Sequence, residues 1–504
     1  MTPLELSVVI GYTVLLVVLA VFGVHRYAMT YLFQRHRYKL AAPRGRFQEL
    51  PRVTVQLPIF NEMYVTDRLL EAVARLDYPR ERLQVQVLDD STDETRTIAR
   101  GRVEALRTQG LDIVYIHRID RTGFKAGALD NGLRTATGEL IAIFDADFVP
   151  DPGFLRRTIQ HFTDPGVGLV QTRWGHLNRS YSALTQAQAV FLDGHFLVEH
   201  VARNRSGRFF NFNGTAGIWR RKAIEDGGGW QHDTITEDLD LSFRSQLSGW
   251  RFVYLPEIVT PAELPVDMNA FKCQQHRWAK GAVQCALKLL GRVLRSDLPV
   301  AVKAEAVIHL TANLAYLIVI PLAILLPVTV AIRSSHGPLE LVLVDLPLFT
   351  AATVSVLSFY ITSQRAQGLS WWQSIKPLPL VMALGIGLAV NNARAVVEAL
   401  MGYQTGFIRT PKHGVKVKGE SVARKKYRAA ATLQPLVELA LAGYMTYGIV
   451  YLWQKGVYSS IPFLVLFQVG FGYVALVSIY EGLRGRVLRW ARLLSPAAAT
   501  TTPE

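Results

Sequence analysis

Long uncharged stretches of apolar residues occur toward both ends of the 504-residue chain. A helix needs about 20 consecutive apolar residues to cross the core of a bilayer. Six stretches are long enough to cross a membrane or to lie in one: Leu6–Val24, Ala306–Ile332, Leu346–Gln364, Pro377–Ala393, Leu439–Gln454 and Gly456–Tyr480. The pattern predicts an integral membrane protein whose apolar helices flank a more polar middle.

The polar middle of the chain has a different pattern. Short runs of apolar, often β-branched residues predict buried strands at Val53–Phe60, Leu83–Leu88 and Leu140–Phe144. Helical patterns at Asp67–Arg75 and Thr95–Thr108 lie between them. Strands that alternate with helices predict an α/β domain built on a mainly parallel sheet.

The distribution of charge changes the picture of the apolar ends. The chain carries 55 Lys and Arg against 40 Asp and Glu, a net charge of +15. The excess is +4 in residues 1–50, +1 in 51–300 and +10 in 301–504. Because it lies beside the apolar stretches and not in the polar domain, it indicates membrane topology and argues against a nucleic-acid partner.

The positive-inside bias predicts which side of the membrane each loop occupies. Basic residues follow the first stretch, between Arg26 and Arg46, and fill residues 401–428, so both regions are expected inside. If Pro377–Leu400 crossed the membrane, the second region would lie outside. We therefore assign that stretch to an interfacial helix and expect five spans, with the N-terminus outside. A cleaved signal peptide is the alternative for the first span, but no Lys or Arg precedes it.

These spans define the expected domains and location. We expect an integral protein of a bacterial inner or plasma membrane, with its polar domain in the cytoplasm. Two cysteines, Cys273 and Cys285, are too few for a disulfide framework or a four-cysteine zinc site. The predicted boundaries are a first span (1–25), a basic linker (26–50), the α/β domain (51–290), two spans (291–364), an interfacial helix (365–400), a basic cytoplasmic loop (401–432), two spans (433–483) and a cytoplasmic tail (484–504).

Polar residues directly follow each of the three predicted strands: Asn61-Glu62, Asp89-Asp90 and Asp145-Ala146-Asp147. Ligands of parallel sheets bind at the carboxyl ends of the strands, so these side chains are expected around one site. Asp145 and Asp147 would point the same way from an extended segment, as two oxygen ligands of a Mg2+ or Mn2+ ion that also binds a diphosphate. For Asp89-Asp90 the alternative is a helix cap.

Two further motifs fall on predicted helices. Thr236-Glu237-Asp238 precedes an amphipathic helix, where acidic residues also complement the helix dipole. Gln274, Arg277 and Trp278 share one helix face. An Arg fork binds phosphate oxygens and a Trp face packs on a sugar ring. The alternative is a basic helix on the membrane surface, which is supported by Lys272, His276 and Lys280.

The motifs in their order resemble the series found in membrane-embedded family 2 glycosyltransferases. The series is Asp89-Asp90, Lys125-Ala126-Gly127, Asp145-Ala146-Asp147, Thr236-Glu237-Asp238 and Gln274-x-x-Arg277-Trp278. The connecting phrases at 171–174, 212–217 and 261–281 resemble the cellulose-synthase-like branch, which makes glucan or mannan backbones. The resemblance spans roughly residues 50–285 and implies a GT-A fold for the α/β domain.

The resemblance also implies a role for each motif residue. Asp89 or Asp90 would contact the nucleotide base, Lys125 would support the nucleotide-sugar, and Asp145 and Asp147 would hold the divalent ion on its diphosphate.

On the acceptor side, the resemblance makes Asp238 the general base that takes the proton from the attacking hydroxyl, with Glu237 beside it among the substrate-binding residues. Arg277 would offset the charge on the leaving nucleoside diphosphate, and Gln274 would close the nucleotide side. Trp278 would stack on the terminal sugar of the acceptor. Attack opposite the leaving group inverts the anomer, so an α-linked donor gives a β-linked product.

A last resemblance lies in the basic loop. Phe407-Ile408-Arg409-Thr410-Pro411-Lys412 is similar to the gating loop Phe-x-Val-Thr-x-Lys of processive polysaccharide synthases, with Arg409 where valine is usual. The matching residues are Phe407, Thr410 and Lys412.

The leading hypothesis is a processive, inverting β-glycosyltransferase in the lipid bilayer. It would elongate a polysaccharide from UDP-glucose or GDP-mannose and thread it through its own helices. One alternative is a non-processive lipid transferase resembling ceramide glucosyltransferase. Another is a transporter, which would not need the ordered carboxylates. The sequence leaves the donor sugar, the oligomeric state and any accessory subunits open.

Overall fold

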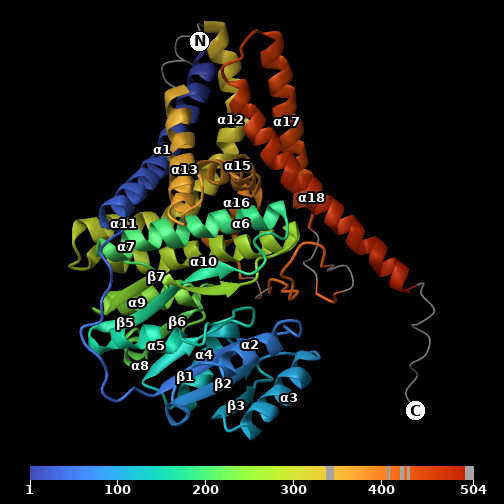
Figure 1. Cartoon of the computed structure of the whole chain (residues 1–504). Coiled ribbons are helices and arrows are strands. Elements are labelled where there is room, and N and C mark those ends of the chain that lie inside the picture. The colour runs from blue at the N-terminus through green and yellow to red at the C-terminus, as the bar shows by residue number, and fades with distance from the viewer. Residues whose placement is uncertain (337–345, 405, 407–408, 421–424, 428–431, 494–504) are drawn as a thin grey trace.

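The structure is a computed structural model that describes residues 1–336, 346–404, 406, 409–420, 425–427 and 432–493. Figure 1 shows an α/β domain with a group of long helices standing on one side of it. The first helix, α1 (Pro3–His36), is one of these long helices, and the chain then descends to the sheet.

In the described residues the domain has one mixed sheet of seven strands, in the order β3-β2-β1-β4-β6-β5-β7. The strands are β1 (Val53–Ile59), β2 (Leu83–Asp89), β3 (Ile113–His117), β4 (Leu140–Ile143), β5 (Val167–His176), β6 (Gly217–Arg220) and β7 (Arg251–Ala262). Strand β6 is antiparallel to both of its neighbours, and the other pairings are parallel. Val53 pairs with both Leu83 and Leu140, so the three predicted strands are adjacent, and the predicted α/β sheet is confirmed.

Helices cover both faces of this sheet. One face packs against α2 (Thr66–Ala74), α3 (Thr95–Thr108) and α5 (Phe154–Ile159). The other packs against α4 (Phe124–Thr135), α6 (Ala183–Asp193), α7 (His200–Arg205), α8 (Arg221–Asp226) and α9 (Glu237–Leu247). Side chains alternate between the two faces along a strand, and β4 shows this: Ile141 and Ile143 enter one core, while Leu140 and Ala142 enter the other.

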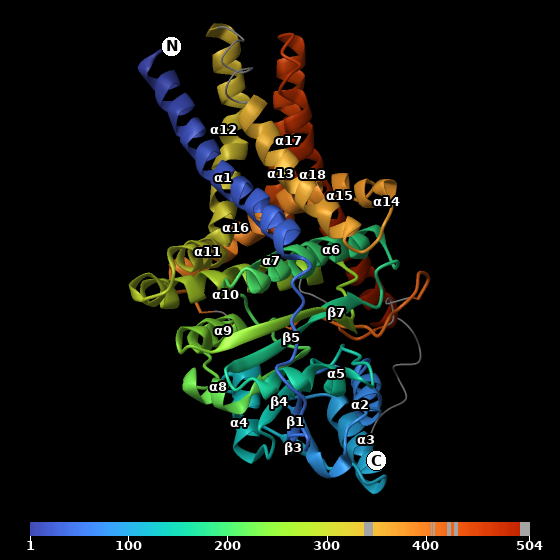
Figure 2. The same cartoon turned by 60° about the vertical axis from the view of Figure 1, so that its left-hand side comes forward.

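A layer of helices separates the sheet from the long helices. It contains α6, α7, the π-helical turn Gly194–Glu199 that joins them, and the 28-residue helix α10 (Met268–Arg295). Figures 1 and 2 show these helices lying across the top of the domain. Helix α1 packs directly against α7 of this layer.

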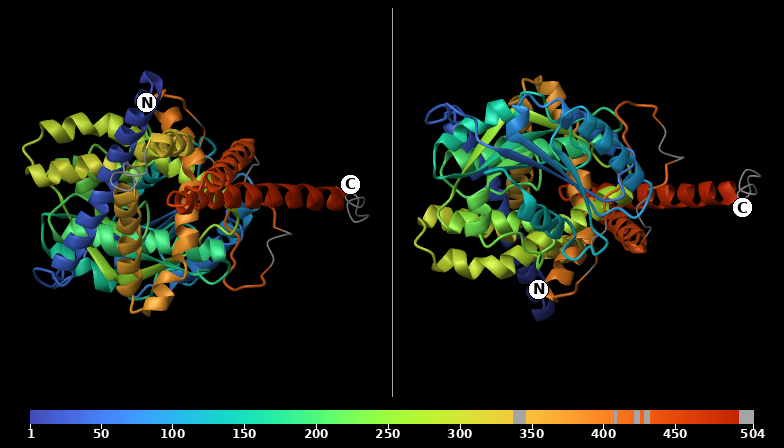
Figure 3. Two further views of the ribbon diagram at one scale, coloured as in Figure 1. Left: turned by 90° about the horizontal axis from the view of Figure 1, so that it is seen from above. Right: turned by 90° about the horizontal axis from the view of Figure 1, so that it is seen from below.

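The long helices supply four of the five candidate membrane segments. They are α1, α11 (Val300–Thr311), α12 (Ala315–His336), α13 (Leu346–Arg365), α17 (Gln434–Gln454) and α18 (Ile461–Leu493). Within the described residues, five segments are long and apolar enough to cross a membrane: Pro3–His36, Val300–His336, Trp371–Leu400, Gln434–Gln454 and Ile461–Arg484. They make the chain an integral membrane protein. Figure 3 shows α18 reaching far beyond the other helices.

The segment Trp371–Leu400 differs from the other four. It is broken into α14 (Trp371–Ile375), α15 (Leu378–Gly387) and α16 (Ala389–Leu400). In its most apolar part 61% of the residues are buried inside the protein, against 22–39% in the other four segments. It contains the stretch that we predict to lie at the interface. Helix α13, predicted to span, stands beside α1 but is not among the five, so the choice between the two stays a prediction.

The basic residues of α10 do not form a stripe on the membrane surface. Lys272 Nζ lies 2.7 Å from Glu438 Oε1 on α17, and Lys280 Nζ lies 3.1 Å from Glu398 Oε2 on α16. His276 contacts the same Glu398 at 3.1 Å. These cations join α10 to the C-terminal helices instead, which removes the main support for the membrane-surface alternative.

Candidate active site

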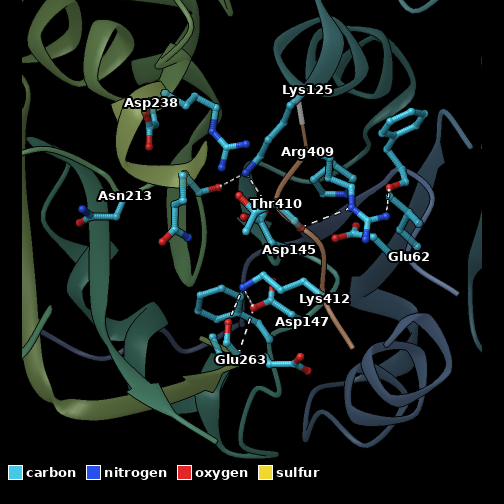
Figure 4. A pocket seen from close by; sticks show the side chains of 18 of the residues that line it. Glu62, Lys125, Asp145, Asp147, Asn213, Asp238, Glu263, Arg409, Thr410 and Lys412 are labelled. Atoms are coloured by element: carbon cyan, nitrogen blue, oxygen red, sulfur yellow. Dashed lines mark hydrogen bonds and ion pairs between the residues drawn. The ribbon is translucent and has the colours of Figure 1, made fainter. Parts of the chain in front are cut away.

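One pocket opens at the carboxyl ends of β1, β2 and β4, below α10. Figure 4 shows several of the side chains that surround it. Most of the residues predicted from the sequence line this pocket: Asp90, Lys125, Asp145, Asp147, Glu237, Asp238, Gln274, Arg277, Trp278, Arg409, Thr410 and Lys412. Phe407 lies outside the described residues. The structure therefore brings these predicted residues together around one pocket, although they come from segments far apart in the chain.

The two aspartates after β2 have different surroundings. The Asp89 carboxylate is buried, accepts hydrogen bonds from the Ser91 N–H (2.8 Å) and the Tyr115 hydroxyl (2.6 Å), and does not line the pocket. Asp90 does line it and is held by Arg118 through two bonds of 2.9 and 2.6 Å. Of the pair, only Asp90 is placed to contact a ligand in the pocket.

Lys125 and Asp145 form the centre of the pocket. Lys125 lies in the first turn of α4, and its Nζ donates to Asp145 Oδ1 at 2.5 Å and to the Gly214 carbonyl at 2.9 Å. Burial lowers the pKa of Lys125, but the carboxylates of Asp145, Glu237 and Asp238 more than offset this and raise it. The site therefore carries a fixed ammonium among several carboxylates.

Asp147 and Lys412 join the α/β domain to the C-terminal basic loop. Lys412 Nζ donates to Asp147 Oδ2 at 2.8 Å (Figure 4). Glu263, which follows β7, accepts the backbone N–H groups of His413 (2.7 Å) and Gly414 (2.8 Å). The Gly414 backbone has a φ of 68°, and a Cβ there would lie 2.6 Å from the Tyr64 carbonyl oxygen. The loop is thus seated on the pocket by side chains and by close backbone contact.

Arg409 takes the place that the resemblance gives to valine. Its Nη1 donates to the Phe60 carbonyl at 3.0 Å, and its guanidinium lies 4.3 Å from the ring centroid of Tyr427. Thr410 beside it is buried. An arginine therefore fits this position, since it bridges the end of β1 and a second segment of the same basic loop.

Asp238 lies at the start of α9, where its Oδ1 accepts the Leu239 N–H at 2.8 Å. Burial, followed by the neighbouring Glu237 carboxylate, raises the pKa of Asp238 to about 7. Burial also raises the pKa of Glu237. A carboxylate with a pKa near neutrality accepts a proton more readily than an exposed one, as a general base requires.

Helix α10 brings its Gln-x-x-Arg-Trp face to Asp238 by a close approach to α9. A Cβ on Gly281 would lie 2.4 Å from Thr236 Cγ2, so only glycine allows the two helices to meet here. One turn earlier on α10, Gln274, Arg277 and Trp278 line the pocket. The Arg277 guanidinium and the Trp278 indole therefore line the same pocket as the Asp238 carboxylate.

Glu62, which follows the first predicted strand, lines the pocket as expected. Other lining residues were given no role of their own from the sequence: Arg121, Trp174, His176, Asn213 and Glu263. Burial, and then the carboxylates of Asp147 and Asp145, raise the pKa of Glu62 to about 7, against the effect of Arg409. Trp174 and His176 are alternate residues at the end of β5, so strand periodicity could have placed them on one face. Glu263 and Asn213 give no comparable local signal.

The donor set fits a divalent ion that is shared with a substrate. Within the described residues, no group of three or more His, Cys, Asp and Glu could hold a metal by itself. Asp145 and Asp147 each bind a lysine ammonium, so the pair already attracts cations. Mg2+ commonly takes one or two carboxylates and completes its shell with phosphate oxygens and water. Two carboxylates that converge in a pocket suit that arrangement.

Comparison with known proteins gives consistent results. A family profile described as "Glycosyltransferase like family 2" matches residues 51–281. "Probable glucomannan 4-beta-mannosyltransferase 9" of Oryza sativa subsp. japonica is 32% identical over 456 residues, 85% of this chain and 82% of the relative. The chain belongs to glycosyltransferase family 2. The resemblance of the motif series to this family is thereby confirmed, and the mannosyltransferase relatives belong to its cellulose-synthase-like branch.

Two further matches extend the family 2 assignment. "Probable glucomannan 4-beta-mannosyltransferase 7" of Oryza sativa subsp. japonica is 41% identical over 295 residues, 55% of this chain and 50% of that relative's length. A solved structure, a mannosyltransferase from Pyrobaculum calidifontis in complex with GDP-Man and Mn2+, superposes with a TM-score of 0.52 at 23% identity and covers 70% of this chain and 97% of that one. The superposition confirms the predicted GT-A fold of this family 2 domain.

Proposed function

We propose that the chain is an inverting mannosyltransferase that lengthens a β-linked mannan or glucomannan from GDP-mannose. The arrangement of Asp238, Lys125 and Asp145 around one pocket carries this proposal. The pKa of Asp238, raised to about 7, suits a base, and the buried Lys125 ammonium suits an anionic diphosphate, so both groups support a transfer reaction in this pocket.

The reaction begins with the acceptor hydroxyl. The Asp238 carboxylate takes its proton as the hydroxyl oxygen attacks the anomeric carbon of the donor. The bond from that carbon to the diphosphate oxygen breaks, and its electron pair leaves with the nucleoside diphosphate. Because the attack comes from the face opposite the leaving group, an α-linked donor yields a β-linked product.

Cationic groups balance the charge on the leaving diphosphate. Lys125 and Arg277 lie in the same pocket, and an Arg fork binds two phosphate oxygens at once. A divalent ion, when bound by Asp145 and Asp147, would supply Lewis-acid stabilisation of the same diphosphate. Lys125 and Lys412, which bind these two aspartates, would stand beside the diphosphate as further cationic groups.

The two tryptophans of the pocket support a sugar acceptor. Trp174 and Trp278 both line it, and indole faces pack on the apolar faces of sugar rings. The Trp174 Nε1–H is buried and has no hydrogen-bond partner among the described residues. Packing of this kind orients the terminal hydroxyl before each transfer.

GDP-mannose is preferred over UDP-glucose as the donor because of the relatives. The two rice proteins are named as glucomannan mannosyltransferases, and the archaeal structure is a complex with GDP-Man. Polymer is preferred over a single lipid-linked sugar because the Lys412 loop is seated on Asp147 beside the membrane helices. Such a seat lets one loop close on each new donor while the product stays bound.

The proposal is tested with purified protein in lipid nanodiscs. Labelled GDP-mannose with Mn2+ should give labelled polymer, and UDP-glucose should give much less. Asp238→Asn should lower transfer at least about 1,000-fold, since the base is lost. Asp233→Asn, on the exposed loop before α9, is the matched control and should keep wild-type activity. Equal activity in Asp238→Asn, or transfer from UDP-glucose alone, would refute the proposal.

A further inference from the structure

One segment of the pocket wall contacts three of the central site residues. The Gly214 carbonyl accepts from Lys125 at 2.9 Å, and Thr215 Oγ1 accepts the Asp145 N–H at 2.8 Å. A Cβ on Gly214 would lie 3.0 Å from Asp238 Oδ2. Gly214 has a φ of 81°, which glycine adopts readily, so the direction of its carbonyl depends on how the neighbouring residues are held.

That support comes from the side chain of Asn213. Figure 4 shows this side chain turned away from Lys125 and Asp145. Its amide lies between two imidazoles: Oδ1 is 2.7 Å from His200 Nε2, and Nδ2 is 2.9 Å from His195 Nε2. The two rings lie 4.2 Å apart between centroids. Both imidazoles belong to the helical layer above the sheet, so Asn213 ties the pocket wall to that layer.

The direction of these hydrogen bonds is fixed by their partners. His200 Nε2 faces two oxygens, Asn213 Oδ1 and the Asn211 carbonyl at 3.1 Å, so Nε2 must carry the proton and donate. Burial lowers the pKa of His200 well below its usual range, so this ring is neutral. The Asn213 amide nitrogen then donates to His195 Nε2, which must be unprotonated.

The proton of His195 therefore sits on Nδ1, 2.9 Å from Glu199 Oε2. Burial raises the pKa of Glu199, but Arg203 and His195 more than offset this and hold it well below its usual range. An anionic Glu199 is an acceptor only, so it favours this tautomer. His195 and Glu199 both lie in the π-helical turn, a distortion that is frequent at functional sites.

The network continues from Glu199 into the membrane helices. Arg203 contacts Glu199 at 3.4 Å and donates from Nε to Glu305 on α11 at 2.8 Å. Glu305 in turn lies 2.9 Å from His25 Nε2 on α1. His195 is therefore held by Asn213 on one side and by Glu199, which leads into this network, on the other.

We propose that His195 is a positioning residue for the transfer reaction. Its unprotonated Nε2 holds the Asn213 amide, and this amide fixes the Gly214 carbonyl to which Lys125 is bonded. The inference rests on the proposed role of Lys125 and Asp238 in glycosyl transfer, but not on the identity of the sugar.

Two replacements of His195 separate positioning from packing. His195→Gln keeps an amide oxygen that can accept from Asn213 but loses the aromatic ring. His195→Phe keeps the ring stacked near Phe196 and His200 but has no acceptor. We expect kcat to fall about 10- to 100-fold in His195→Phe, with a smaller change in the KM for donor, and to stay within about 3-fold of wild type in His195→Gln.

The opposite ranking, with His195→Phe active and His195→Gln impaired, would mean that the ring only fills space and would overturn the proposal. Asn213→Ala should copy His195→Phe, and the double variant should cost no more than either single one. Additive losses would contradict a shared function. Glu104→Gln on the exposed face of α3 is the control and should match wild type.

A spectroscopic measurement tests the inference without any transfer activity. In a sample with 15N-labelled histidine, the His195 signals are found by difference from the His195→Gln variant. We expect Nδ1 to carry the proton and Nε2 to be bare. A proton on Nε2, alone or together with Nδ1, would overturn the inference, whereas absence of transfer with a bare Nε2 would refute only the proposed function.

Discussion

At the scale of single residues, the buried carboxylates of the site differ in the charge of their nearest neighbour. Asp90 and Asp145 are each neutralised by a cation within 2.6 Å, whereas Asp238 has a carboxylate neighbour, Glu237. Desolvation and a like charge both disfavour the ionised form. These environments make Asp238, like Glu62, a group that can take up a proton near neutral pH, and of the two only Asp238 belongs to a motif with a proposed role as base.

The first prediction concerns the pH dependence of transfer. A base must be ionised to act, and burial raises the pKa of Asp238 to about 7. The kcat/KM for donor should therefore rise with pH and level off above about pH 8, and it should fall about tenfold per unit well below pH 7. Glu237→Gln removes the second cause of the raised pKa, so this acid limb should move to lower pH. An unmoved limb would contradict the assignment of the limb to Asp238.

The sequence predicted these residues better than it predicted their partners. Asp145, Asp238 and Arg277 were found because each belongs to a motif with a fixed spacing. Glu263 and Asn213 were not, because their function depends on contacts with residues that are 150 and 18 positions away in the chain. Likewise, only the structure distinguishes the two adjacent aspartates. Asp89 accepts a hydrogen bond from Tyr115 inside the domain, whereas Asp90 lines the pocket.

At the scale of elements, two kinds of contact hold the C-terminal part of the chain to the domain. The loop at 409–414 rests on the pocket through Lys412, Glu263 and the close backbone approach at Gly414. Helix α17 is joined to α10 by the Lys272–Glu438 ion pair. Each contact predicts a measurable consequence.

The second prediction tests the seat of the loop. Gly414→Ala places a Cβ 2.6 Å from the Tyr64 carbonyl, so the loop should lift from the pocket. Gly419→Ala is the control, since Gly419 also has a positive φ but no atom within 4 Å of its Cβ. We expect faster proteolysis at Lys412 and at least tenfold weaker donor binding for Gly414→Ala only. Equal effects of the two variants would show that backbone strain, not the seat, is responsible.

The third prediction tests the ion pair between α10 and α17. Both side chains are almost fully buried, so Glu438→Gln leaves the Lys272 ammonium without its counter-charge. The expected loss is about 3–5 kcal/mol of stability, measured by thermal unfolding in detergent. Lys272→Met with Glu438→Leu should recover most of it. Asp226→Asn, which breaks the exposed pair with Lys222, should cost less than about 1 kcal/mol. A loss that small in Glu438→Gln would contradict a structural role for the pair.

At the scale of the whole molecule, a layer of helices lies between the sheet that carries the pocket and the long apolar helices. The alternation of strands and helices predicted the α/β domain, and the apolar stretches predicted an integral membrane protein. Apolar length alone did not decide whether Leu346–Arg365 or Trp371–Leu400 crosses the membrane, because both stretches are long and apolar. The sequence offered the distribution of positive charge as an additional criterion.

The fourth prediction tests the sidedness that follows from this charge. In a variant without Cys273 and Cys285, a single cysteine at Ser335 or Lys418 is exposed on opposite sides of the predicted membrane. A membrane-impermeant maleimide should label Ser335→Cys in intact cells and Lys418→Cys only after lysis. Labelling of Lys418→Cys in intact cells would reverse the topology and place the pocket outside.

The central claim is that one chain adds mannose repeatedly through Asp238 and produces a β-linked polymer. The most direct test is the length of the product made by purified protein in nanodiscs from GDP-mannose and Mn2+ during the first few per cent of donor consumption. We predict long chains already at this stage, digestible by a β-mannanase, and none with Asp238→Asn. Products of a single added sugar, or a polymer that resists β-mannanase, would contradict the account.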